Sequence, residues 1–132
     1  MRGKIYTLEE LDHALPLVSA IVEDIREGYR RLRVRLESLG LEGRSGAMNP
    51  EEIIFDLPPD VRDLVDEIRD FISELGELGL YLRDPATGLV EAYGEQGENI
   101  VYFSWKPGEK RVRFYHGLFG SHRERKPVLA AV

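Results

Sequence analysis

The strongest constraint on the fold is a run of apolar residues whose spacing alternates between three and four over residues 8–39. The run comprises Leu8, Leu11, Leu15, Val18, Val22, Ile25, Tyr29, Leu32, Leu36 and Leu39. This heptad spacing places every member on one side of an α-helix. Thr7 and Glu10 have the spacing of a capping box at its start. We therefore predict one long helix over residues 7–39, kinked but continuous at Pro16, with a new helix that starts at Pro16 as the alternative.

A second helical stripe follows a glycine-rich segment. Residues 40–49 contain three glycines and no periodicity, which indicates a flexible connection, and the next residues, 50–55, predict a short helical turn. The 3-4 spacing then returns in Val61, Leu64, Ile68, Phe71, Leu75 and Leu78. We predict a helical hairpin over residues 7–78, whose second helix contacts both the first helix and a sheet.

The hydrophobic period changes from helical to alternating at Leu80. Strands are predicted at residues 80–83, 89–93, 99–105 and 111–116, joined by turns rich in proline and glycine. They form a four-stranded antiparallel meander over residues 80–117, followed by a basic tail, 118–132. If apolar residues pair across the last hairpin, Phe103 shares a face with Phe114 and His116, while Tyr102 and Tyr115 lie opposite. The expected fold is a single α+β domain over residues 1–132, with the helical hairpin packed on this sheet.

The composition limits the chemistry and the location. The chain has 132 residues and no cysteine, which excludes disulfides, thiolate metal sites and a cysteine nucleophile. Acidic residues occur where a signal peptide would need an apolar stretch, and the longest largely apolar run, residues 14–22, is about half of the roughly 20 residues that span a membrane. We expect a cytoplasmic protein without membrane segments. Abundant glutamate and arginine, with few side-chain amides, favour a thermophilic source.

The basic residues are concentrated near the C-terminal end. Residues 105–127 carry seven basic and two acidic side chains, a net charge of +5, whereas the whole chain carries −6. Such a segment indicates either a surface that faces an anion or a basic region that docks on the acidic helices of the same chain. The second interpretation is slightly preferred.

Residues 101–109 (VYFSWKPGE), followed by Tyr115-His116 and residues 125–127, resemble the bacterial family called domain of unknown function 2203. Residues 6–10 with Leu15-Pro16, residues 79–84 and residues 88–90 carry the same resemblance, which covers nearly the whole chain. The resemblance implies no activity, because the family's name records none. The chain departs from the family pattern at Glu91, where an aspartate is expected, at Tyr115 in place of a tryptophan, and at Gly117 in place of an acidic residue.

A few residues are candidates for chemistry. The candidate catalytic residues are His116, Glu109 and Glu91, and the candidate metal ligands are His116, Asp84 and Glu91. Arg125 and Lys126 are candidates for holding a small anion or an anionic cofactor. No cofactor is required by the sequence, although these side chains are compatible with a divalent metal. The simpler interpretation, which we prefer, is that His116 ends a core strand while Asp84 and Glu109 stabilise turns.

Four arginines of the first helix, together with the basic segment, raise the question of nucleic-acid binding. The overall acidity, and the glutamate one helical turn before Arg31, favour a solvated face of ion pairs on residues 30–35 instead. Nucleic acid is therefore not an expected partner.

The two apolar stripes differ in length. Residues 8–39 span roughly 48 Å, whereas residues 61–78 span roughly 27 Å, which leaves about 20 Å of stripe to be covered. The cover comes from residues 53–55, from the sheet or from a second chain. A heptad of this length favours pairing between chains, so we predict a homodimer along residues 7–39. The predicted function is a self-associating, non-catalytic binding module that can also contact a protein partner. The alternative is a small enzyme, or a metal- or anion-binding protein, with its site around His116, Glu91, Glu109 and Arg125.

Overall fold

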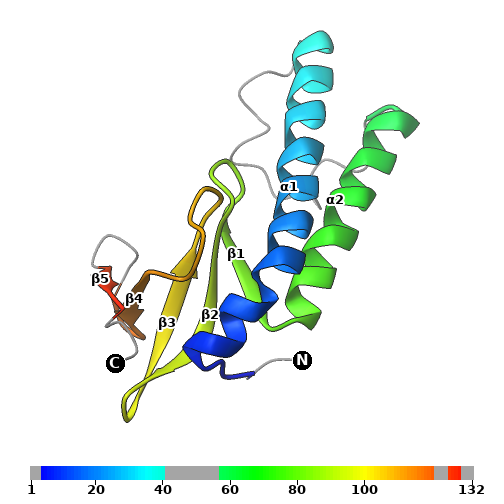
Figure 1. Cartoon of the computed structure of the whole chain (residues 1–132). Coiled ribbons are helices and arrows are strands. Elements are labelled where there is room, and N and C mark those ends of the chain that lie inside the picture. The colour runs from blue at the N-terminus through cyan, green and yellow to red at the C-terminus, as the bar shows by residue number, and fades with distance from the viewer. Residues whose placement is uncertain (1–3, 41–56, 121–124, 129–132) are drawn as a thin grey trace.

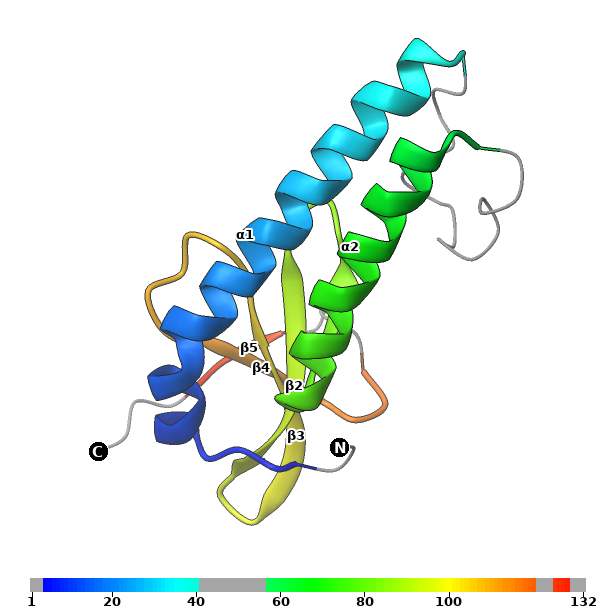
Figure 2. The same ribbon diagram turned by 90° about the vertical axis from the view of Figure 1, so that its right-hand side faces the viewer.

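The computed structural model describes residues 4–40, 57–120 and 125–128. Two helices lie side by side and cover one face of an antiparallel sheet (Figure 1 and Figure 2). The elements are α1 (Leu8–Ser38), α2 (Pro59–Glu77), β1 (Leu80–Asp84), β2 (Leu89–Gln96), β3 (Asn99–Trp105), β4 (Phe114–Gly117) and β5 (Lys126–Pro127). The α+β prediction is confirmed, but the sheet has five strands in the order β1-β2-β3-β4-β5 rather than four. The predicted short turn at residues 50–55 lies outside the described residues.

Helix α1 begins as its sequence predicts. Thr7 accepts a hydrogen bond from the Glu10 backbone N–H, and the Glu10 carboxylate accepts one from the Thr7 N–H, so the capping box is complete. The helix continues through Pro16, and its first turns lean away from the axis of the rest (Figure 1). The kinked, continuous helix is therefore confirmed.

The apolar stripe of α1 is covered within the chain except at its last member, Leu39, which is 38% exposed. Its first half, from Leu11 to Ile25, packs on the sheet in one core cluster. Its second half packs on α2, where Leu32 and Leu36 are buried against residues between Val61 and Ile68. The helices extend beyond the sheet at this end (Figure 2). The length mismatch is thus resolved by the sheet, and the homodimer along α1 stays a prediction.

The sheet turns one face to the helices. Val90, Ala92, Val101 and Phe103 point toward α1 and belong to the main core cluster. Because side chains alternate along a strand, the intervening residues of β1, β2, β3 and β4 lie on the other face. They include Tyr81, Arg83, Glu91, Tyr93, Tyr102, Ser104, Phe114 and His116.

The prediction of which side chains of the last hairpin share a face of the sheet is wrong. Tyr102 lies opposite His116, and Phe103 lies opposite Tyr115, so His116 is on the face away from the helices. The cause is the segment before β4, which the sequence assigned to a strand. Val112 is buried in the main core, and its backbone N–H donates to Asp12 of α1 at 2.7 Å instead of to a neighbouring strand. The strand therefore begins only at Phe114, and its pairing with β3 is shifted by one residue.

The N-terminal segment adds a contact that the sequence did not indicate. Tyr6 forms a parallel bridge with Gly94 of β2, with hydrogen bonds to Tyr93 O and from Glu95 N. Its hydroxyl donates to Leu78 O at 2.5 Å. Burial is the main reason that the pKa of Tyr6 is raised. Tyr6 thus attaches the N-terminal segment to strand β2 and to the end of α2.

The arginine-rich face of α1 is a face of ion pairs, as expected. Arg30 pairs with Glu27, Arg31 with Glu67, Arg33 with Glu37, and Arg35 with Asp60. None of the helices in the described ranges combines the length and the apolarity needed to cross a membrane.

Candidate functional site

A buried acid–imidazole pair lies on the sheet face away from the helices. The Nε2 atom of His116 is 2.5 Å from Oε2 of Glu91, and the two residues are 3% and 5% exposed. Glu91 is on β2 and His116 is on β4, so their side chains meet across the intervening strand β3. Ser104 lies between them on β3, paired with Glu91 on one side and with Phe114 on the other. A small residue at this position leaves room for the two side chains to meet.

The polar atoms of this pair are occupied by protein groups. Nδ1 of His116 lies 2.9 Å from the Gly117 carbonyl, and Oε1 of Glu91 accepts a hydrogen bond from Arg83 Nε at 2.7 Å. Each ring nitrogen therefore faces an acceptor, whereas a neutral imidazole has only one N–H. Both ring nitrogens of His116 are therefore in contact with protein groups. The arrangement links β1, β2 and β4 through one buried carboxylate.

Aromatic rings surround the pair. Tyr93 and Tyr102 stack with centroids 4.9 Å apart, Tyr81 meets Tyr93 edge-on at 5.9 Å, and Tyr102 lies 5.3 Å from the His116 ring. The Arg83 guanidinium is 5.4 Å from the centroids of both Tyr81 and Tyr102. The hydrogen bond with Tyr93, together with burial, raises the pKa of Tyr102. Buried Ser104 Oγ has no hydrogen-bond partner among the described residues.

Glu109 and Arg125 form a second group. Arg125 Nη1 lies 3.7 Å from Glu109 Oε2, and its guanidinium is 4.3 Å from the centroid of the Phe114 ring. Glu109 also closes the turn after β3, because its carboxylate accepts the Lys106 N–H and its carbonyl accepts the Trp105 Nε1–H. Between described residues, no hydrogen bond or ion pair joins Glu109 or Arg125 to Glu91 or His116. The predicted site residues thus lie in two separate groups.

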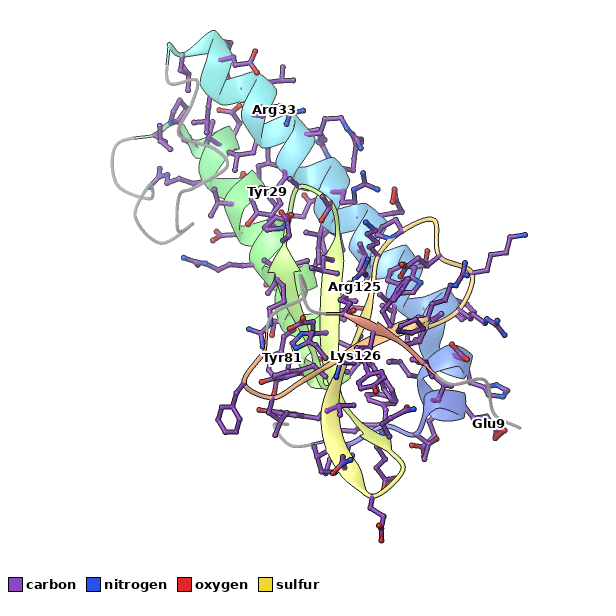
Figure 3. All side chains as sticks on the ribbon, turned by 90° about the vertical axis from the view of Figure 1, so that its left-hand side faces the viewer. Glu9, Tyr29, Arg33, Tyr81, Arg125 and Lys126 are labelled. Atoms are coloured by element: carbon purple, nitrogen blue, oxygen red, sulfur yellow. The ribbon has the colours of Figure 1, made fainter. Side chains whose placement is uncertain are left out.

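The other predicted residues lie apart from both groups. Asp84 accepts hydrogen bonds from the Ala86 N–H and the Thr87 hydroxyl in the turn between β1 and β2. Lys126 is exposed on β5, opposite Tyr115 (Figure 3). Across the described ranges, no three His, Asp or Glu side chains are arranged to hold a metal ion.

Whether a described basic side chain is ion-paired depends on where in the fold it lies. Five of the six described Lys and Arg side chains of residues 105–127 make no ion pair with another described residue, and we call these five the basic surface: Lys106, Lys110, Arg111, Arg113 and Lys126. On α1 and α2, every described arginine except Arg62 is ion-paired. Among the described residues, no ion pair joins these five side chains to an acidic residue of α1 or α2, and the docking of the basic region on the acidic helices stays a prediction. The segment approaches α1 through the Val112 backbone N–H, which needs no basic side chain.

Two residues of the basic surface line a hollow of about 380 Å³ between the N-terminal turns of α1 and strands β4 and β5. We call it the α1–β4 hollow, and its lining residues are Leu8, Asp12, Arg111, Val112, Arg113, Phe114, Pro127 and Val128. In Figure 2 the same turns of α1 lie in front of β4 and β5. Sequence reasoning placed the anion contact at Arg125 and Lys126 and missed this hollow. The only sequence signal for it is the basic segment itself, since Asp12 is remote in the chain.

The fold and these two groups define a class of protein: a small α+β chain with a helical hairpin on one face of an antiparallel sheet and a buried acid–imidazole pair on the other. The chain belongs to the family described as uncharacterized conserved protein (DUF2203), which matches residues 4–128. The comparison with curated proteins gave no match, and neither did the comparison with solved structures.

Proposed function

We propose that this chain is a non-catalytic module that binds anions through the basic surface. The observation that carries the proposal is the contrast in ion pairing. Nearly all described arginines of the helices are neutralised by neighbouring carboxylates, whereas five basic side chains around β4 and β5 are not. Guanidinium groups without a protein carboxylate are suited to bind a carboxylate or phosphate from solution.

The buried pair supports binding over catalysis. A general base must present a lone pair to the proton that it removes. Both ring nitrogens of His116 face protein acceptors, and each carboxylate oxygen of Glu91 has a protein partner. This arrangement suits a connection that fixes the sheet, since a network with all members satisfied makes its strands rigid. It holds β4 in place, and the hollow is built against β4.

The experiment is a titration of the protein with inorganic phosphate, followed by two-dimensional ¹H–¹⁵N NMR. We expect the largest shifts at the backbone amides of residues 111–114, and we expect Arg113→Gln and Arg111→Gln each to weaken phosphate binding. Because the interaction is electrostatic, binding should also weaken as sodium chloride is added. The matched control is Arg30→Gln, which removes an arginine that is ion-paired with Glu27 and should leave phosphate binding unchanged.

Two results would contradict the proposal. One is the absence of any phosphate-dependent shift at residues 111–114. The other is an equal loss of binding in Arg30→Gln and Arg113→Gln, since binding would then follow the net charge of the chain rather than the basic surface.

A further inference from the structure

The α1–β4 hollow contains charges of both signs that do not neutralise one another. Arg111 and Arg113 line it together with Asp12, yet the structure records no ion pair between either arginine and Asp12 within 4.0 Å. Opposite charges that share a hollow without pairing are both available to a ligand. The inference below rests on the proposed anion binding and specifies the ligand of the same site.

Asp12 is held in position by the backbone. Its Oδ1 accepts the Val112 N–H at 2.7 Å, and no described residue donates a hydrogen bond to its Oδ2. The one recorded bond fixes the side chain at the wall of the hollow, while Oδ2 keeps its capacity to accept a charged donor. A ligand cation at this point would gain a charge-assisted hydrogen bond without moving the protein.

The rest of the lining is apolar. Leu8 comes from the first turn of α1, Phe114 from β4, Pro127 from β5, and Val128 from the residue that follows. The volume of about 380 Å³ lies within the range of pockets that take small molecules. The hollow therefore offers an apolar wall between a carboxylate and two guanidinium groups.

We infer that the hollow binds a zwitterion: a free α-amino acid with an apolar side chain. The ligand carboxylate pairs with Arg113 or Arg111, its ammonium group pairs with Oδ2 of Asp12, and its side chain packs on Leu8 and Val128. A simple anion uses only the first of these contacts. A zwitterion uses the acidic and the basic groups together, and this accounts for the presence of both in one hollow.

The test compares three probes that share one carbon skeleton: L-leucine, isocaproate, which lacks the amine, and isoamylamine, which lacks the carboxylate. Binding is followed by ¹H–¹⁵N NMR, with the Val112 amide as the reporter next to Asp12. A charge-assisted hydrogen bond is worth about a factor of ten or more in affinity, so L-leucine should bind at least about tenfold more tightly than isocaproate. Isoamylamine, which cannot contact the arginines, should bind more weakly than L-leucine.

A conservative variant isolates the role of Asp12. Asp12→Asn keeps an oxygen that can accept the Val112 N–H but removes the charge, so the fold should be preserved. It should bring the affinity for L-leucine down to that for isocaproate. If this variant does not fold, the comparison of L-leucine with isocaproate on the parent protein still tests whether the hollow prefers a zwitterion.

The outcomes separate this inference from the proposed function. Equal binding of L-leucine and isocaproate to the parent protein would overturn the zwitterion inference while leaving anion binding in place. Binding of L-leucine that survives both Asp12→Asn and Arg113→Gln would overturn it as well, because the ligand would then lie elsewhere. Failure of phosphate, isocaproate and L-leucine alike to perturb residues 111–114 would overturn both proposals.

Discussion

The buried pair of Glu91 and His116 allows a quantitative prediction, in which two replacements of Glu91 are compared. Glu91→Leu keeps much of the side-chain volume but leaves Nε2 of His116 and Nε of Arg83 without an acceptor. Removing one partner of a buried charge pair costs roughly 3–5 kcal/mol. His116 is 3% exposed and feels the full loss, whereas the Arg83 side chain is 44% exposed and can regain water. We therefore expect the lower end, about 3 kcal/mol.

Glu91→Gln is the matched comparison, and it should cost much less. The amide nitrogen of glutamine can donate to Nε2 of a neutral His116 ring, whose Nδ1–H then donates to the Gly117 carbonyl. The amide oxygen can still accept from Arg83. Every polar group keeps a partner, so we expect a loss of about 1 kcal/mol, which is the scale of one neutral hydrogen bond.

The assay is urea denaturation at neutral pH, followed by the fluorescence of Trp105, the single tryptophan of the chain, which is 3% exposed. The free energy of unfolding should fall in the order parent, Glu91→Gln, Glu91→Leu, with about 2 kcal/mol between the two variants. The melting temperature of Glu91→Leu should drop by roughly 10 °C. Equal stabilities of the two variants, or losses below about 0.5 kcal/mol in both, would refute the idea that this pair holds the sheet together.

Two further predictions concern backbone and capping positions. In Gly94→Ala, an added Cβ would lie 2.1 Å from a ring carbon of fully buried Phe103, so a loss of at least about 2 kcal/mol is expected in urea denaturation. Its control, Gly76→Ala in α2, meets no atom within 4 Å and should gain about 0.5 kcal/mol; an equal response at both positions would contradict the packing argument. The Thr7 backbone N–H lowers the pKa of Glu10 below its usual 4.5, so the stability from this carboxylate is present above that value and is lost as the pH falls through the lowered pKa. Glu10→Gln should therefore have a lower melting temperature than the parent at neutral pH, and its melting temperature should fall less as the pH is lowered. An equal fall in both proteins would count against the capping box.

The sequence predicted the turns and caps because each is decided within a few residues. The capping box of α1 needs only two side chains three positions apart, and both hydrogen bonds are found. Asp84 and Glu109 stabilise turns, as the simpler interpretation of these residues expected. In each case the donor and the acceptor are neighbours in the chain, so tertiary structure had little to decide.

The sequence predicted several residues of the candidate site but not the contacts between them. Glu91 and His116 were both named from their chemistry, yet the sequence also joined Glu109 and Arg125 to them. The structure places the four residues in two pairs. Arg83, Ser104 and Tyr102 were not predicted to belong to the site, because their membership depends on which residues of β1, β2, β3 and β4 lie opposite one another.

The sequence by itself determined the two helices, three of the strands and the division between the helical and the sheet halves, because hydrophobic periodicity is local and is repeated many times. Tertiary structure alone decided the pairing of β3 with β4, the addition of β5 and the bridge of Tyr6 to Gly94. Each depends on an interaction between remote parts of the chain, such as the Val112 N–H with Asp12, 100 residues away. A single contact of this kind leaves no period in the sequence. It nevertheless fixes the register that buries His116 against Glu91 and opens the α1–β4 hollow beside the basic surface.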